Sequence, residues 1–394
     1  MKTVEPRLIH GERIVRIAEN RAYVFADESV HDVSAQLAES GLPAAAVVDR
    51  DLKLTGIIVA KELFSILGKP FGRDLLFRKA IGSAASSAVS FLYTEQIREV
   101  EPHLVQDFAM DENRYYCLVD ERGAFCGIFS VKDMLVYSAE MQKRDMNLAG
   151  SIQSRIVPQY TYRRGHSCEL ASTVVMAQSV GGDYYHVREY EPGKWFFCLC
   201  DISGKGIAAA IITAVLEGFL CTADYRAGLA VLVERLNALI LHTFSLEKYV
   251  TGVFCLYDEP SGCLTYCDMG HGLIYRRKTA DGRPVFVPAA ASADNMPVGI
   301  MEDVPVEVKT MQIARGEVLV LFTDGLSEQT DQKGNAFDLC IVSDCISEAF
   351  RARRNTSEGV LRRVKIAVLE AFYQFRADAA QHDDLSLFML HRFS

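Results

Sequence analysis

The sequence lacks the features that mark several classes of protein. Its eleven cysteines include no CxxC pair and form no compact framework, which favours a reducing compartment over disulfide-bonded secretion. No apolar run approaches the roughly 20 residues that a membrane-spanning helix needs, and the polar start of the chain does not resemble a signal peptide. The net charge of −9 leaves no basic surplus to neutralise phosphates. We therefore expect a cytoplasmic protein with neither a membrane nor a nucleic acid as partner.

The 394 residues are enough for two or three domains. The pattern along the chain predicts a repeat-containing domain over 8–137, a connecting helix over 138–158 and a second domain over 159–394. The repeat consists of two similar phrases, Val47-Val48-Asp49 with Thr55-Gly56-Ile57-Ile58 and Leu118-Val119-Asp120 with Cys126-Gly127-Ile128-Phe129. Each phrase predicts two strands around a turn, followed by a helix. This pattern resembles a pair of CBS domains, a module that often binds adenine nucleotides.

The resemblance to CBS domains implies a nucleotide site in the second copy. There, Ser130 and Asp133 follow Gly127 at the spacing with which the family contacts a ribose, whereas the first copy has Val59 and Glu62 at the matching positions. The same spacing also fits a helix that Ser130 caps, with an acidic residue in its first turn. An adenine nucleotide at Ser130 and Asp133 and a purely structural cap are both open.

The connecting helix is amphipathic. Met134, Met141 and Leu148 recur every seven residues, and Ile152 and Ile156 continue the apolar edge. This edge packs either on a neighbouring part of the same chain or on a second copy, as the coiled-coil seam of a homodimer.

The last stretch predicts one domain of antiparallel sheets covered by helices. Its strand-like runs are joined largely by turns and do not alternate regularly with helices, which argues against a doubly wound parallel sheet. The expected strands cover 195–200, 249–257, 264–268, 273–277, 318–322 and 385–391, and the expected helices cover 207–221, 229–244, 340–351 and 359–375.

Four aspartates in this domain lie next to glycine or at the ends of predicted strands. They are Asp183, Asp201, Asp324 and Asp383. Hard divalent cations prefer oxygen ligands such as carboxylates and backbone carbonyls, and glycine lets the backbone approach an ion closely. The spacing therefore predicts one metal centre assembled from distant segments.

Six motifs occur in order along the same stretch: Val180–Tyr185, Asp201–Ala210, Met269–Gly272, Pro297–Ile300, Leu321–Glu328 and Asp383–Leu387. Together they resemble the SpoIIE/RsbU branch of the PPM metal-dependent serine/threonine phosphatases. The resemblance implies an α-β-β-α sandwich, two antiparallel sheets flanked by helices, with two Mn²⁺ or Mg²⁺ ions between the sheets. The whole chain is then a multidomain α/β and α+β protein.

The resemblance also implies a role for each motif residue. Asp201 would bridge both ions and the carbonyl of Ile202 would bind one of them. Asp324 and Asp383 would bind the other ion, and Asp183 would complete the shell directly or through water. Two such ions share a water, lower its pKa and present a hydroxide to the phosphoryl group, so Asp201 and Asp183 are the expected catalytic residues.

Three positions have two interpretations each. The family commonly has a second acid where this chain has His186, which is either a metal-shell residue or a residue outside that shell. Lys205 either binds the substrate phosphate as a point charge or is solvated on its glycine loop. His271, in a Gly-His-Gly turn, is expected to be structural.

The sequence therefore predicts a phosphoserine/phosphothreonine protein phosphatase controlled by a CBS module. By resemblance, its substrate is a phosphorylated anti-anti-sigma protein of the STAS type. One alternative is a non-catalytic signalling module that binds a partner while the CBS pair senses a nucleotide. Another is a phosphatase that acts on small phosphate esters.

Overall fold

The computed structural model describes the chain except for residues 6–10, 109–113, 245–247, 281–282, 290–294, 303–304, 353–358 and 394. Two compact units divide it, Met1–Lys143 and Arg144–Ser394. The first residue of the expected repeat domain, residue 8, and the last residue of the expected C-terminal domain lie outside the described residues. Within the described ranges, no helix combines the length and the apolar character that a bilayer crossing requires.

The N-terminal unit contains the predicted repeat as two copies of a strand, a helix, two strands and a second helix. The first copy comprises β2 (Ala22–Phe25), α1 (Val30–Ser40), β3 (Ala44–Val48), β4 (Leu54–Val59) and α2 (Ala60–Leu67); the second comprises β5 (Ser90–Leu92), α4 (Ile97–Phe108), β6 (Tyr115–Val119), β7 (Phe125–Ser130) and α5 (Val131–Ile156). In each copy the first strand pairs parallel with the second, which pairs antiparallel with the third. The short elements β1 (Lys2–Thr3) and α3 (Gly72–Leu76) complete the unit.

The aspartate that ends each repeated phrase closes the turn between the two antiparallel strands. One carboxylate oxygen of Asp49 accepts hydrogen bonds from the backbone N–H groups two and four residues further on, both at 2.9 Å. Asp120 repeats this arrangement at 3.0 and 2.9 Å. The repeated hydrophobic-hydrophobic-Asp phrase thus encodes a strand that ends in a side-chain-capped turn.

Helix α5 runs unbroken from Val131 to Ile156, so residue 138 is not a helix boundary. No proline or glycine near that position interrupts it, and the helix ends just before Pro158 because the residue that precedes a proline is biased away from helical geometry. The residues of the apolar edge that recurs every seven residues differ in their burial. Met134 is buried in the core of the N-terminal unit, whereas Leu148 and Ile152 are 60% and 54% exposed.

The C-terminal unit contains two antiparallel sheets, as predicted. One sheet has the order β10-β11-β12-β13-β16, and the other has the order β15-β14-β17-β18-β9-β8. The strands are β8 (Tyr160–Arg164), β9 (Cys168–Val175), β10 (Asp183–Glu191), β11 (Lys194–Ile202), β12 (Val250–Asp258), β13 (Cys263–Met269), β14 (Ile274–Ala280), β15 (Arg283–Pro288), β16 (Lys309–Gln312), β17 (Val318–Phe322) and β18 (Leu385–Arg392).

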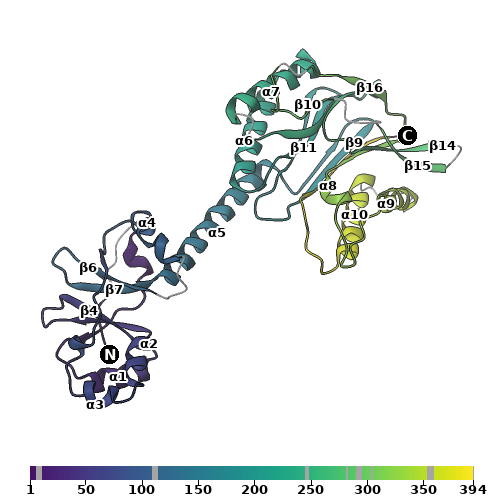
Figure 1. Cartoon of the computed structure of the whole chain (residues 1–394). Coiled ribbons are helices and arrows are strands. Elements are labelled where there is room, and N and C mark those ends of the chain that lie inside the picture. Colours follow the sequence, from purple (N-terminus) through teal and green to yellow (C-terminus); the bar gives the residue numbers. More distant parts are fainter. Residues whose placement is uncertain are drawn as a thin grey trace. The chain divides into compact units, whose positions relative to one another are not determined.

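Helices cover the outer face of each sheet (Figure 1). Helices α6 (Ile207–Thr222) and α7 (Leu229–Phe244) pack on the first sheet, and α9 (Cys340–Arg351) and α10 (Val360–Arg376) pack on the second. Strand β11 is buried on both faces, and its successive aromatic side chains point to opposite faces of the sheet. Phe197 stacks on Phe388 of the other sheet with ring centroids 4.6 Å apart, while Phe196 contacts Tyr225 on the helix side at 4.5 Å. The unit is therefore an α-β-β-α sandwich, and the expected fold class is confirmed.

Candidate metal and phosphatase site

The hairpin of β10 and β11 brings the first two candidate aspartates together. Asp183 begins β10 and Asp201 lies near the end of β11, and the register pairs these two residues directly. Directly opposed residues of an antiparallel pair have Cβ atoms about 5 Å apart. Two carboxylates that are 18 positions apart in sequence thus lie at the same end of the β10–β11 hairpin.

The second sheet supplies the other two aspartates. Strand β17 ends at Phe322, and Asp324 opens the short helix α8 (Asp324–Ser327). Asp383 lies just ahead of β18, which pairs with β17. A hydrogen bond of 2.8 Å from the Thr323 hydroxyl to Asp183 joins the two sheets at this point.

Burial and the mutual repulsion of carboxylates dominate the electrostatics of this group. Burial, and after it the neighbouring Asp201, raises the pKa of Asp183 well above its usual value. Burial and the charges of Asp324 and Asp383 raise the pKa of Asp201 to about 7. Like charges that converge in this way favour a bound cation. In the described residues, however, no three acidic, histidine or cysteine side chains already stand at ligating distance from one point.

The backbone beside Asp201 offers oxygen atoms that suit a divalent ion. A Cβ on Gly182 would lie 2.8 Å from the carbonyl oxygen of Ile202 and 3.2 Å from Oδ1 of Asp201. The carbonyl oxygen of Gly204 would lie 3.4 Å from the same point. Because glycine lacks that Cβ, three oxygen atoms surround a space that any other residue would fill. The donor set is entirely oxygen, which fits Mn²⁺ or Mg²⁺.

Asp384 is a residue of this region that the sequence interpretation did not use. It is buried, and its two carboxylate oxygens accept hydrogen bonds from the backbone N–H groups of Ala177 at 2.7 Å and Gly182 at 2.6 Å. Asp384 therefore holds the loop that precedes Asp183. Its place beside Asp383 in the Asp383–Leu387 motif is the sequence feature that could have identified it.

Lys205 is paired with a proposed metal ligand. Its ammonium group lies 3.0 Å from Oδ1 of Asp383 and donates to the carbonyl oxygen of His382 at 3.1 Å. Burial works against the charged form, but the contacts with Asp383 prevail and raise the pKa of Lys205. Lys205 thus supplies positive charge to the carboxylate group itself.

His186 lies on the face of β10 opposite to Asp183, because side chains alternate along a strand. Its Nδ1 donates to Glu217 of α6 at 3.1 Å, and the Tyr184 hydroxyl donates to the same oxygen at 2.6 Å. Although burial works in the opposite direction, these two hydrogen bonds hold the pKa of Glu217 at about 2. His186 therefore contacts the helix layer, and its side chain points away from the space between the sheets.

His271 holds the turn between β13 and β14. Its Nε2 bonds to the carbonyl oxygen of Phe322 at 2.9 Å, and the buried Asp268 accepts from the backbone N–H of His271 at 2.8 Å. These contacts fix the end of β17 just ahead of Asp324.

In the N-terminal unit, Ser130 and Asp133 bond to each other. The Ser130 hydroxyl and backbone N–H both donate to Oδ2 of Asp133, at 2.8 and 2.7 Å, and the Asp133 N–H donates back at 3.2 Å. This reciprocal arrangement is a capping box at the start of α5. The pair meets the structural expectation for this spacing, and a ribose would have to compete with these hydrogen bonds.

Helix α5 contacts the loop that leads into Asp183. The buried side-chain amide of Gln153 accepts from the backbone N–H of Gly181 at 3.1 Å and donates to its carbonyl oxygen at 2.8 Å. A Cβ on Gly150 would lie 2.1 Å from the carbonyl oxygen of Ser179. The last turns of α5 therefore pack tightly on residues 179–181.

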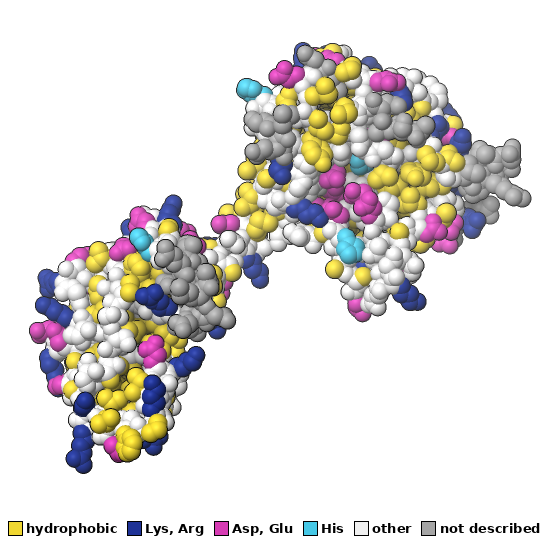
Figure 2. Space-filling model, in the orientation of Figure 1, with side chains coloured by type: hydrophobic (Ala, Val, Ile, Leu, Met, Phe, Trp, Pro, Cys, Tyr) yellow, Lys and Arg dark blue, Asp and Glu magenta, His cyan; other side chains and the backbone are white. Residues whose placement is uncertain are grey.

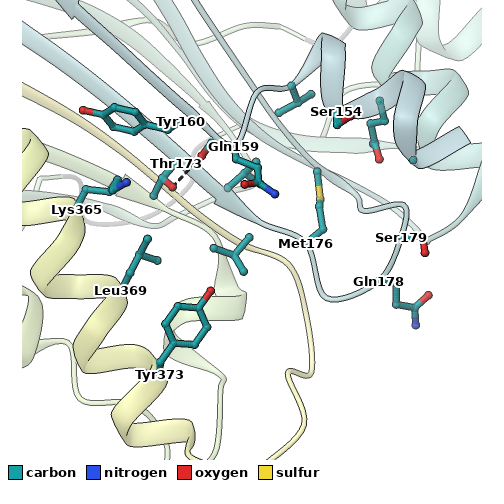
Figure 3. A pocket seen from close by; sticks show the side chains of 15 residues that line it. Ser154, Gln159, Tyr160, Thr173, Met176, Gln178, Ser179, Lys365, Leu369 and Tyr373 are labelled. Atoms are coloured by element: carbon teal, nitrogen blue, oxygen red, sulfur yellow. Dashed lines mark hydrogen bonds between the residues drawn. The ribbon is translucent and has the colours of Figure 1, made fainter. Parts of the chain in front are cut away.

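A cavity of about 430 Å³ lies beside this contact, between the end of α5, β9 and α10. Figure 3 shows Lys365, Leu369 and Tyr373 of α10 on one side and Met176 with its loop on the other. A smaller cavity of about 250 Å³ is lined by Asp201 and Asp324, which are two of the expected metal ligands. Figure 2 shows acidic side chains gathered on one face of the C-terminal unit and bordered by hydrophobic ones.

Two family models match the chain. The model described as Stage II sporulation protein E matches residues 191–393, a range that includes three of the four candidate aspartates but not Asp183. The CBS domain model matches residues 16–69, which is the first copy of the repeat.

Curated relatives and a solved structure agree with these matches. The chain is 23% identical over 263 residues to phosphoserine phosphatase RsbU of Bacillus subtilis (strain 168), covering 64% of this chain and 70% of that protein. It is 21% identical over 194 residues to phosphoserine phosphatase RsbP of the same organism, covering 48% of this chain and 46% of that protein. The SiaA-PP2C domain of Pseudomonas aeruginosa shares the fold, with a TM-score of 0.50 and 17% identity over 65% of this chain and 99% of that one. The chain therefore belongs to the SpoIIE family of PPM-type serine/threonine protein phosphatases and carries a CBS domain on the N-terminal side of its phosphatase domain.

Proposed function

We propose that the C-terminal unit hydrolyses phosphoserine or phosphothreonine in a protein substrate with the help of two Mn²⁺ or Mg²⁺ ions. The observation that carries this proposal is that Asp183 and Asp201 face each other across the β10–β11 pair, while Asp201 and Asp324 line one cavity. Asp383 is close enough to raise the pKa of Asp201. When bound, the ions supply a hydroxide nucleophile at neutral pH and offset the charge of the phosphoryl oxygens.

The protein's own residues hold and orient this centre. Asp201 would contact both ions, the Ile202 carbonyl would bind one, and Asp324 and Asp383 would bind the other. Asp183 would complete the shell. Its orientation is fixed by the hydrogen bond from Thr323, which also ties the two sheets together where the carboxylates meet.

We infer the substrate class from the relatives. RsbU and RsbP of Bacillus subtilis are named phosphoserine phosphatases, and the resemblance of the motifs to their branch implies a phosphorylated anti-anti-sigma protein of the STAS type. Such a folded substrate would present its phosphoserine to the cavity lined by Asp201 and Asp324.

We further propose that the CBS module controls the phosphatase through α5. The start of this helix belongs to the core of the N-terminal unit through Val131 and Met134, and its end holds Gly181 through Gln153. A ligand, of which an adenine nucleotide is the first candidate, would act by binding one state of the module better than another. A homodimer seam along Leu148 and Ile152, both exposed, is a second route by which the helix could transmit that change.

The decisive experiment is a phosphatase assay of the full chain on a phosphoserine protein and on an aryl phosphate. Activity should require Mn²⁺ or Mg²⁺ and disappear in EDTA, and Asp201→Asn should abolish turnover while the protein stays folded by circular dichroism. Asp344→Asn, which changes an exposed carboxylate on α9, is the matched control and should keep wild-type activity.

Other outcomes would redirect the proposal. Undiminished turnover after verified metal removal would exclude the metal mechanism. A folded, metal-loaded chain that hydrolyses neither substrate would favour the non-catalytic signalling module. Activity on the aryl phosphate but not on any phosphoprotein would favour small phosphate esters as substrates.

A further inference from the structure

Two lysines lie at the glycine turn that follows Asp201. Lys205 is part of the turn, and Lys248 reaches it from the segment just ahead of β12. The Lys248 ammonium lies 2.6 Å from the position that a Cβ on Gly204 would take. Gly204 has a φ of 89°, in the left-handed region that favours glycine, so the turn both requires glycine and leaves room there for the Lys248 side chain.

The backbone fixes the distance between Lys248 and the turn. The N–H of Ser203 donates to the carbonyl oxygen of Tyr249 at 2.9 Å, and the N–H of Tyr249 donates to the Ser203 hydroxyl at 2.9 Å. Ser203 and Tyr249 also line the cavity that contains Asp201 and Asp324. Lys248 is therefore attached to the rim of the proposed active site by its immediate neighbour.

The two lysines differ in their partners. Lys205 is engaged by the Asp383 carboxylate at 3.0 Å and by the His382 carbonyl. For Lys248, the described residues, which leave out 245–247, form no ion pair or hydrogen bond with the ammonium group. A half-buried ammonium without an anionic partner is suited to bind an anion that arrives from solution.

We propose that Lys248 binds the phosphate of the substrate, while Lys205 serves as the counter-ion of Asp383. This inference rests on the proposed phosphatase function and assigns the phosphate-binding cation to a residue outside the family motifs. The Lys248 ammonium would donate to a peripheral phosphoryl oxygen and orient the phosphate at the cavity. Lys205 would instead offset the negative charge of the carboxylate group, in competition with a metal ion for Asp383.

The test measures binding of inorganic phosphate to the Mn²⁺-loaded full-length protein by calorimetry, together with its inhibition constant in the aryl phosphatase assay. Lys248→Met should weaken phosphate binding at least about tenfold, because a charge-assisted hydrogen bond is lost. Its half-saturating Mn²⁺ concentration should stay within about twofold of the wild type. Lys248→Arg, which keeps the charge, should recover most of the affinity.

Lys205→Met should show the opposite pattern. Its phosphate affinity should stay within about twofold of the wild type, and its half-saturating Mn²⁺ concentration should fall because the competing cation is gone. Lys194→Met is the matched control, because Lys194 lies at the far end of β11 in an ion pair with Glu191; both constants should be unchanged.

Phosphate binding that is unaffected by Lys248→Met would overturn the assignment, and so would a tenfold loss in Lys205→Met. These outcomes are separable from failure of the proposed function. Calorimetry reports phosphate binding whether or not the protein turns over a substrate, whereas an inactive wild type with normal phosphate binding would reject catalysis alone.

Discussion

Asp384 and Gly182 join the two sheets of the phosphatase unit through a hydrogen bond of 2.6 Å from the glycine N–H to the buried carboxylate. The other oxygen of Asp384 accepts from Ala177 at 2.7 Å. Asp384, the neighbour of the proposed metal ligand Asp383, thus holds in place the loop that carries Gly182 and leads into Asp183.

This relationship predicts the effect of Asp384→Asn. The amide of asparagine has only one acceptor oxygen, so one of the two backbone donors would face an NH₂ group and lose its partner. We expect a loss of about 1–3 kcal/mol in the free energy of unfolding, measured by urea denaturation at pH 7. The half-saturating Mn²⁺ concentration should also rise, because the loop at Gly182 borders the proposed metal site. Unchanged values of both quantities would show that Asp384 does not hold this loop.

A second prediction concerns His186→Asp. From the sequence, this change would restore the charge count of the family motif and tighten metal binding if His186 touched the metal shell. In the structure it would place a carboxylate against Glu217, where His186 now donates at 3.1 Å. We therefore expect a loss of about 2 kcal/mol in stability, because a hydrogen bond to a carboxylate is replaced by a like-charge contact. Mn²⁺ and Mg²⁺ titrations should match the wild type, and a clear tightening for Mg²⁺ would contradict this placement.

Glu217 provides a prediction about pH. Its pKa is held at about 2 in the folded protein, below the ordinary value of 4.5. A depressed carboxyl pKa stabilises the fold above pH 4.5, and this contribution is lost as the pH falls from 4.5 towards 2. Its size is at most about 3 kcal/mol. Unfolding free energies of the wild type and Glu217→Gln, compared at pH 7 and pH 3.5, should differ less at pH 3.5, since part of the contribution is lost there. A difference that is constant with pH would exclude this linkage.

The last prediction tests the contact of α5 with the active-site loop. Gln153→Leu keeps the approximate size of the side chain but removes its hydrogen bonds to both backbone groups of Gly181. We expect the turnover number to fall about tenfold or more, because misplaced catalytic geometry is costly. Any response to ligands of the CBS module should fall with it. Ser154→Ala, on an exposed position of the same helix, is the control. Wild-type turnover in Gln153→Leu would show that this contact does not set the catalytic geometry.

Local patterns in the sequence were sufficient for much of the secondary structure. The run that ends at Phe322 is apolar throughout and the run that begins at Leu385 is largely so, because β17 and β18 are buried on both faces. Such runs, bounded by turn signals, favour strands. Strands β8, β9, β10, β15 and β16 were not predicted, because charged, other polar and proline residues interrupt their apolar pattern. The repeat of the N-terminal unit was readable because Asp49 and Asp120 close identical turns.

What the sequence by itself determined is the family, through six motifs in order along the chain, and its four aspartates beside glycine or at strand ends predict an oxygen-liganded metal site. Only the tertiary structure decided which side chains lie beside the proposed metal site and which point away from it. The alternation of side chains along β10 turns His186 towards Glu217 and Asp183 towards Thr323, and the pairing of distant strands brings Asp384 to Gly182. These contacts join residues up to about 200 positions apart, and no local pattern encodes them because their energy depends on packing between sheets.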